Sequence, residues 1–209
     1  MDTVHTSQCT SERGRYETLL LLIEGCCILM FHGGIPIIII GFSSLFFAWA
    51  YTRGPFPLSR LGLGEIAAFI FFGPIPVWGT YFLQTKVHHD LPILIGFVPG
   101  FISAALMAVN NLRDREEDRR SGKKTIATIL SENGARYLVI NFVLLSAFFL
   151  PLVTRELKSL IVILPALLFF NNWKKVITAP IDQDLNNVLA NTGKYLFLQC
   201  LVHSIVIVL

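Results

Sequence analysis

The most charged stretch of this sequence is residues 110–125, NNLRDREEDRRSGKKT, which directly follows an apolar segment. Within it, Asn111, Asp114 and Asp118 have the spacing N-x-x-D-x-x-x-D. At about 100° per residue, these three side chains fall within an arc of about 60° if one helix continues through the run. Mg²⁺ binds one or two carboxylates and leaves the rest of its shell to water and phosphate oxygens. The spacing therefore indicates a magnesium site on Asn111, Asp114 and Asp118.

Four cationic residues follow immediately: Arg119, Arg120, Lys123 and Lys124. Positive charge beside Mg²⁺ suits a diphosphate, because the charge of this leaving group must be neutralised before it departs. The alternative is a mixed-charge helix end at a membrane surface, in which Arg115 pairs with an Asp carboxylate. The spacing alone leaves both interpretations open.

The elements that must position these residues are strongly apolar. Of the 209 residues, 54% are hydrophobic and only 15% are charged, whereas a soluble domain usually carries about a quarter charged residues. Backbone in lipid must satisfy its own hydrogen bonds, so apolar segments predict helices. The expected fold class is an all-α, polytopic transmembrane bundle over residues 17–209, preceded by a polar segment, residues 1–16. About seven spans are predicted: 17–31, 34–51, 63–84, 91–111, 135–153, 158–171 and 195–209.

The positive charges divide unevenly between the two sides of these spans. Lys86, Arg155 and Lys158 fall on one side, and the remaining 14 of the 17 Lys and Arg residues fall on the other. The positive-inside rule therefore predicts a cytoplasmic N-terminus. The same side receives the long polar loops 52–62, 112–134 and 172–194, so the site is expected there. A net charge of +3, without a basic patch interleaved with aromatic residues, argues against nucleic acid as a partner.

The run NNLRDREEDRRSGKKTIA resembles the second aspartate-rich motif of the UbiA superfamily of intramembrane prenyltransferases. Its form N-N-x-R-D-x-x-x-D-x-x-x-G-K-x-T is closest to the branch that prenylates 1,4-dihydroxy-2-naphthoate in menaquinone biosynthesis. Residues 51–65, YTRGPFPLSRLGLGE, resemble that branch's Y-T-x-G-P-x-P-L loop followed by G-L-G-E, and FFGPIPVWGTYFLQT at 71–85 continues the similarity. The segment LNNVLANTGKYLF is similar to the loop before the branch's last helix.

This resemblance implies an enzyme that transfers a polyprenyl group from polyprenyl diphosphate to an aromatic quinone precursor, with Mg²⁺ as cofactor. The implied location is a lipid bilayer, expected to be the bacterial inner membrane. The roles that carry over are metal and diphosphate binding for Asn111, Asp114 and Asp118, diphosphate neutralisation for Lys123 and then Arg119, and substrate contact for Tyr51 and Arg60. Glu65 is either a contact on the acceptor side or a helix N-terminal acid favoured by the helix dipole.

The sequence departs from the family in one place. The family's first aspartate motif is expected upstream of the first span, but residues 1–16 contain Asp2 as their one aspartate. The seven spans correspond to the family's third to ninth, so the chain is expected to lack the N-terminal quarter and to be weakly active or inactive alone. The alternatives are a non-catalytic remnant or prenyl-lipid-binding membrane protein, and a prenyltransferase of the 4-hydroxybenzoate type.

Overall fold

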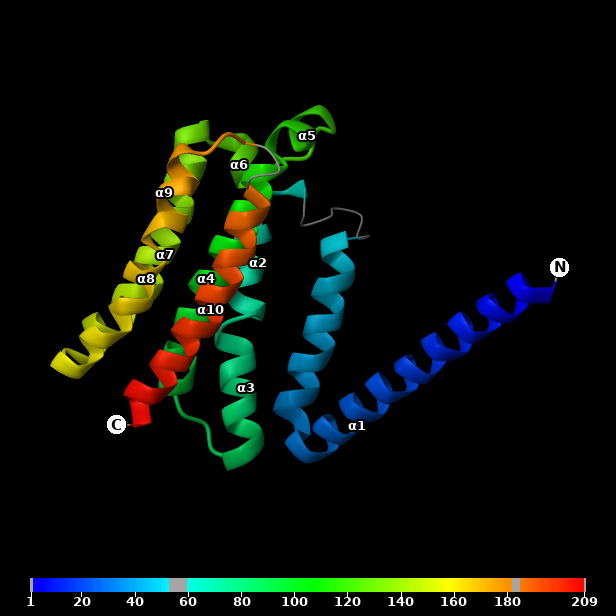
Figure 1. The fold of residues 1–209 in the computed structure, drawn as a ribbon. Coiled ribbons are helices and arrows are strands. Elements are labelled where there is room, and N and C mark those ends of the chain that lie inside the picture. Colours follow the sequence, from blue (N-terminus) through cyan, green and yellow to red (C-terminus); the bar gives the residue numbers. More distant parts are fainter. Residues whose placement is uncertain (1, 53–59, 182–184, 209) are drawn as a thin grey trace.

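The computed structural model describes residues 2–52, 60–181 and 185–208 (Figure 1). Apart from one isolated parallel bridge between Leu61 and Lys124, these residues form helices, turns and loops. The predicted all-α class is therefore confirmed. The helices are α1 (Asp2–Thr52), α2 (Gly64–Phe71), α3 (Pro74–Thr85), α4 (Leu91–Arg113), α5 (Arg115–Arg120), α6 (Ile126–Ile129), α7 (Glu132–Thr154), the 3₁₀ helix η2 (Leu157–Ile163), α8 (Leu164–Leu168), α9 (Phe170–Thr178) and α10 (Leu185–Val208).

Helix α1 contains the first two predicted spans in one sharply bent element. The bend is at Gly34, whose φ of 64° and ψ of −158° are not helical, and Pro36 follows inside the helix. Glycine adopts positive φ without the steric penalty of a side chain, which explains why the chain turns here. The second arm of α1 runs beside α3, while the first arm points away from the other helices (Figure 1).

Helices α2 and α3 together make up the predicted span 63–84, with a short break between them at Phe72 and Gly73. The break packs against α4 with almost no space between the backbones. A Cβ atom built on Gly73 would lie 2.6 Å from the Cα of Gly100 and 2.6 Å from the carbonyl oxygen of Gly96. Small residues spaced four apart permit such close helix contact in membrane proteins, and here they hold α2 against α4.

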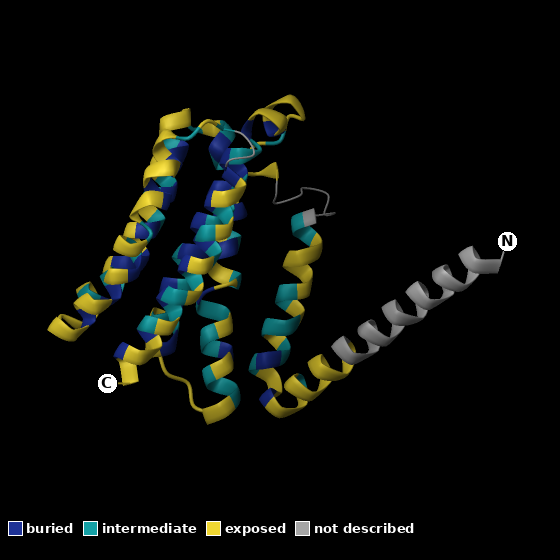
Figure 2. Ribbon diagram, in the orientation of Figure 1, coloured by how far each residue is buried: buried dark blue, intermediate teal, exposed yellow. Residues whose placement is uncertain are grey.

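Helix α4 is the centre of the bundle and contacts α2, α3, α7 and α10. Its inward side chains, including Val98, Ile102, Val109 and Leu112, are fully buried or nearly so. Figure 2 shows buried residues where the helices face one another and exposed residues along their outer sides. Many of those exposed residues are large hydrophobics such as Phe197, which is the surface expected of a protein surrounded by lipid.

By the criteria of length and composition, the structure has fewer candidate spans than the seven predicted from the sequence. Within the described residues, four helices are long and apolar enough to cross a membrane, and the bent pair Leu157–Leu168 and Phe170–Thr178 would make a fifth. The fused helix α1 contributes one such span, Ile23–Tyr51. Helix α10 is continuous and long enough, but it is not among these candidates. The count of seven and the cytoplasmic N-terminus stay predictions, as does the division of the chain at residue 16.

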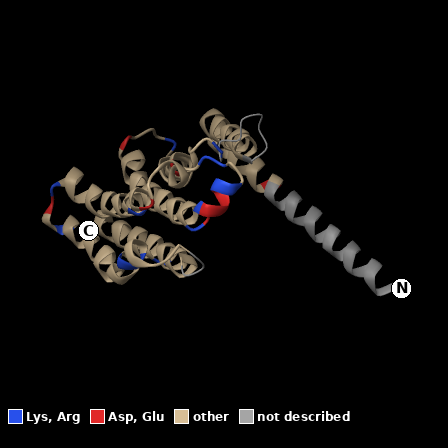
Figure 3. Cartoon of the chain, turned by 90° about the horizontal axis from the view of Figure 1, so that it is seen from above, with Lys and Arg blue, Asp and Glu red and all other residues tan. Residues whose placement is uncertain are grey.

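The connections that were expected to carry the site meet at one end of the bundle. Helices α5 and α6, the end of α9 and the beginning of α10 all lie at the upper end in Figure 1. Seen from above, the three acidic residues of α5 lie between basic residues at both of its ends, close to further basic residues of the same end of the bundle (Figure 3). The fold therefore gathers the charged run and its neighbouring loops beside one another.

Candidate functional site

Helix α4 does not continue through the charged run. It ends at Arg113, and Asp114 has φ −88° and ψ 6°; the short helix α5 begins with the next residue. The N–H of Asp118 still donates to the carbonyl oxygen of Asp114 over 2.8 Å, so the chain bends without losing that hydrogen bond. The condition under which the three side chains of Asn111, Asp114 and Asp118 would share a 60° arc, one continuous helix, is therefore not met.

Arg115 gives the physical reason for the bend. Its buried guanidinium donates from Nε to the carbonyl oxygen of Ala127 at 2.7 Å and from Nη2 to that of Leu130 at 3.0 Å. These bonds hold α5 against α6, which itself begins at Thr125 with a capping box. Among the described residues, the nearest carboxylate is that of Glu116, 3.9 Å from Nη1. Arg115 therefore connects α5 to α6 and does not pair with an Asp carboxylate.

Asp118 and Lys123 form a partly buried ion pair. Gly122 has φ +71°, and its N–H donates to Arg119 while that of Lys123 donates to the carbonyl oxygen of Asp118. This is the Schellman arrangement that terminates a helix, and it folds Lys123 back over α5. The Nζ atom then lies 3.1 Å and 3.2 Å from the two carboxylate oxygens of Asp118. The structure thus brings together two of the three predicted catalytic residues.

Asp114 is paired differently. Its carboxylate accepts two hydrogen bonds from Arg113, Nε to Oδ1 at 2.7 Å and Nη2 to Oδ2 at 2.9 Å. Arg113 also donates to the side-chain oxygen of Asn186 in α10 at 2.8 Å. Bidentate pairs of this kind are among the stronger charge-assisted contacts. Asp114 is therefore bound to a guanidinium linked to α10, while Asp118 pairs with Lys123.

Asn111 lies in a buried cluster between α4 and α2. Its Nδ2 donates to Oε1 of Glu65 over 2.9 Å, and Glu65, in the first turn of α2, is 1% exposed. The residue before it, Gly64, fits closely: a Cβ there would be 3.3 Å from the hydroxyl of Tyr51 and 3.7 Å from Nδ2 of Asn111. The structure therefore places Tyr51 beside Asn111, two residues that lie 60 positions apart in the sequence.

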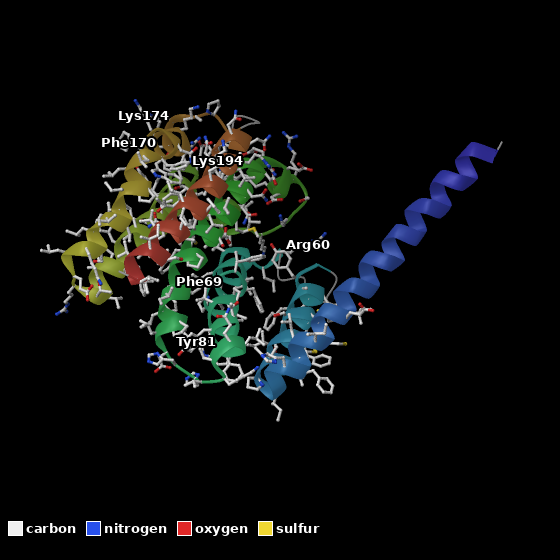
Figure 4. The ribbon with its side chains drawn as sticks, turned by 60° about the horizontal axis from the view of Figure 1, so that its bottom comes forward. Arg60, Phe69, Tyr81, Phe170, Lys174 and Lys194 are labelled. Atoms are coloured by element: carbon white, nitrogen blue, oxygen red, sulfur yellow. The ribbon has the colours of Figure 1, made fainter. Side chains whose placement is uncertain are left out.

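The two loops with family-like motifs also meet. The bridge between Leu61 and Lys124 joins the segment before α2 to the segment after α5. Arg60 is exposed and lies between the bundle and α1 (Figure 4). Arg119 is also exposed, with Nη1 at 3.6 Å from Oε1 of Glu116. Within the described residues, no hydrogen bond ties Arg60 or Arg119 to the Asn111–Glu65 cluster, so their roles stay predictions.

An apolar cavity adjoins the cluster. It has a volume of about 520 Å³ and lies between α1, α2 and α4, where its wall includes Phe47, Tyr51, Gly64, Phe71 and Met107. The Tyr51 hydroxyl makes a long contact of 3.9 Å with the Met107 sulfur. Since Gly64 lines the cavity and lies next to both the Tyr51 hydroxyl and the Asn111 amide, the cavity ends at the polar cluster. A long apolar group lying in the cavity would therefore place a polar head at this end of the bundle.

The oxygen ligands present are of the kind that Mg²⁺ prefers. Among the described residues, no group of three or more His, Cys, Asp or Glu side chains is arranged to hold a metal. The carboxylate of Asp118 and the amide of Asn111 nevertheless supply hard oxygen donors, and Glu65 Oε2 is buried without a hydrogen-bond partner. A buried carboxylate oxygen without a partner indicates a site that can accept positive charge. The donor chemistry therefore fits Mg²⁺, while the ligand set Asn111, Asp114 and Asp118 stays a prediction.

The buried contact of Glu65 with Asn111 was not predicted from the sequence. The available signal was an acid at the beginning of an apolar span, a position where a charge is usually functional or paired. The two carbonyl oxygens that Arg115 binds were not predicted, because only the folded α5–α6 turn brings them to its guanidinium. Asn186 was not identified either, although it lies in the segment LNNVLANTGKYLF that was singled out by resemblance.

Comparison with known proteins agrees with these motifs. A family model described as the UbiA prenyltransferase family matches residues 6–191. The chain is 38% identical over 107 residues to a 1,4-dihydroxy-2-naphthoate octaprenyltransferase of Haemophilus influenzae, covering 51% of this chain and 34% of the relative. It is 37% identical over 99 residues to the protein of the same description in Escherichia coli, covering 47% of this chain and 32% of the relative.

A more distant relative carries a different description. The chain is 29% identical over 119 residues to a UbiA prenyltransferase domain-containing protein 1 of Dictyostelium discoideum, with 57% of this chain and 36% of the relative covered. The chain thus spans about a third of the length of the curated relatives that it matches. No solved structure matches it.

Proposed function

Because the chain belongs to the UbiA prenyltransferase family, we propose that it transfers a polyprenyl group from polyprenyl diphosphate to an aromatic acceptor within a membrane. We propose 1,4-dihydroxy-2-naphthoate as the acceptor, in menaquinone biosynthesis, and the bacterial inner membrane as the location. The similarity to the two 1,4-dihydroxy-2-naphthoate octaprenyltransferases above supports this acceptor. The observation that carries the proposal is the apolar cavity ending at the cluster of Tyr51, Glu65 and Asn111.

The residues of this chain have distinct roles in the proposed reaction. The apolar walls of the cavity hold the prenyl chain and keep water from the allylic cation, which water would otherwise convert to an alcohol. Lys123 and Arg119 attract the diphosphate and offset its negative charge. Asn111, Asp114 and Asp118 would hold Mg²⁺, which supplies further neutralisation of the leaving group. Tyr51, at the end of α1, and the exposed Arg60 orient the diphosphate or the acceptor.

The proposed chemistry is balanced without an oxidant or reductant. The bond between the allylic carbon and the diphosphate oxygen breaks, and both electrons leave with diphosphate. The electron-rich ring then forms a carbon–carbon bond to the allylic cation. With the naphthoate acceptor, the substituted ring carbon loses its carboxylate as carbon dioxide and the ring becomes aromatic again.

A second candidate is a membrane protein that binds a prenyl diphosphate without turnover. It is favoured by the side-chain pairs, because Asp114 is held by Arg113 and Asp118 by Lys123. A metal would have to compete with both cations for these carboxylates. This candidate shares the binding site of the proposed enzyme and differs in the chemical step alone.

One experiment separates these functions. The 209-residue protein would be purified in lipid nanodiscs and tested with Mg²⁺ and geranylgeranyl diphosphate, first for binding and then for transfer to 1,4-dihydroxy-2-naphthoate or 4-hydroxybenzoate. Prenylated naphthoate would support the proposed enzyme, and turnover at a normal rate would contradict the expectation that this chain alone is weakly active or inactive. Mg²⁺-dependent binding without product would favour the second candidate. Absence of binding would overturn both, and preference for hydroxybenzoate would overturn the proposed acceptor.

A further inference from the structure

Glu65 is an acid in a place where a neutral residue would be more stable. It is 1% exposed, its Oε1 accepts one hydrogen bond from Asn111, and its Oε2 has no partner. Burying a carboxylate is unfavourable unless its oxygens are paired. A glutamine could accept the same hydrogen bond from Asn111 without burying a charge. The stability of α2 and α4 therefore does not explain why an acid is present.

An ionised carboxylate differs from an amide in the hydrogen-bonding groups that it offers. It has acceptors and no donor, so Asn111 must present its NH₂ group to Glu65. The Oδ1 atom of Asn111 is then directed away from Glu65 and is available to a cation or to a ligand donor. A glutamine at 65 would permit either orientation of the Asn111 amide, because it carries both a donor and an acceptor.

The residues around the Glu65–Asn111 pair connect it to the proposed site. Gly64 lies between the Tyr51 hydroxyl and the Asn111 amide and also lines the apolar cavity. The bridge from Leu61 to Lys124 brings the segment that leads to Glu65 beside the segment that follows Lys123. Glu65 itself is 1% exposed and is hydrogen-bonded to Asn111, so it would act on a ligand through Asn111.

We infer that Glu65 is a positioning residue that fixes the Asn111 amide with its oxygen directed toward the metal–diphosphate site. This inference rests on the proposed function and adds to it a residue outside the predicted ligand set. Hydrogen-bond partners that orient metal ligands typically contribute 10- to 100-fold to metal affinity. Loss of the carboxylate should therefore weaken Mg²⁺-dependent binding and leave the fold intact.

The test uses the full chain and a non-hydrolysable probe, farnesyl thiolodiphosphate, so that binding is read without turnover. Glu65→Gln should raise the Mg²⁺ concentration needed for half-maximal probe binding by about 10- to 100-fold, while the melting temperature stays the same or rises. Glu156→Gln is the matched control, because this exposed acid lies at the opposite end of α7, paired with Lys158. It should bind the probe as the wild type does.

A double-mutant cycle decides whether Glu65 acts through Asn111. In an Asn111→Ala background, Glu65→Gln should cause no further loss of binding, because the group that it orients is gone. Additive losses, or a Glu65→Gln protein that binds like wild type, would overturn the inference and leave the proposed function standing. Absence of Mg²⁺-dependent probe binding by the wild type would overturn both. If Glu65→Gln does not fold, Glu65→Asp, which shortens the reach to Asn111 but keeps the charge, must show the same loss of Mg²⁺ affinity and the same dependence on Asn111.

Discussion

Substitution of Gly73 by alanine should destabilise the contact that holds α2 against α4. A Cβ at this position would lie 2.5 Å from the carbonyl oxygen of Phe69, 2.6 Å from the Cα of Gly100 and 2.6 Å from the carbonyl oxygen of Gly96. Favourable contacts between such atoms occur at about 3.5–4.0 Å, so the backbones must separate by roughly 1 Å. All three neighbours are backbone atoms, and no flexible side chain can yield to the new methyl group. Overpacking of this kind costs about 1–3 kcal/mol, and we expect the upper half of that range.

The assay is reversible unfolding of the protein in mixed micelles, followed by tryptophan fluorescence, with Gly193→Ala as the control. Gly193 is inside α10, and a Cβ there would meet no atom within 4 Å. Its replacement should stabilise the protein or leave it unchanged, because alanine is favoured over glycine within a helix by about 0.5–1 kcal/mol. If Gly73→Ala unfolds at the same denaturant concentration as the wild type, the close contact of α2–α3 with α4 is not as described.

Two further predictions concern the charged turn. Lys123→Met should lower the free energy of unfolding by about 1–3 kcal/mol, because it leaves the buried Asp118 carboxylate unpaired. Asp118→Asn in the same background should restore most of this loss. If Lys123→Met and the wild type were equally stable in micelle unfolding, the ion pair would be refuted. Arg115→Met should speed amide hydrogen exchange across 114–131, since the carbonyls of Ala127 and Leu130 lose their donor. Arg120→Met, at an exposed position, should leave this exchange unchanged. Unchanged exchange in Arg115→Met would contradict the role of Arg115 in holding α5 against α6.

The sequence was sufficient to predict a helical membrane protein and to identify its charged turn. Apolar segments predict helices in lipid whatever their partners are, and the spacing of Lys and Arg located the end of the bundle where the polar connections gather. The bend at Asp114 was not predictable in this way. It depends on Arg115 reaching Ala127 and Leu130, and those carbonyls are available only after Thr125 has started α6. Helical periodicity extrapolates a local pattern and does not include such contacts.

The count of seven spans stays a prediction, and glycines set the limits of the helices at two places. The two apolar runs separated by His32, Gly33 and Gly34 form the two arms of α1, which meet at the non-helical residue Gly34. Conversely, the run 63–84 looks like one helix and is broken at Gly73, because Gly96 and Gly100 of α4 allow close packing at that point. Glycine can either end a helix or permit close packing, and only its three-dimensional neighbours distinguish the two.

The site is divided between parts of different rigidity. Asn111 and Glu65 belong to α4 and α2, and the glycine contact at Gly73 fixes the distance between these helices. Asp118 and Lys123 belong to a short turn held mainly by the hydrogen bonds of Arg115 and the cap at Thr125. Groups on packed helices are positioned more precisely than groups on turns. Arg115→Met should therefore weaken probe binding through the Asp118–Lys123 half, while Gly73→Ala should weaken it through the Asn111–Glu65 half. If both changes left Mg²⁺-dependent binding intact, neither half would be positioned by the contacts described.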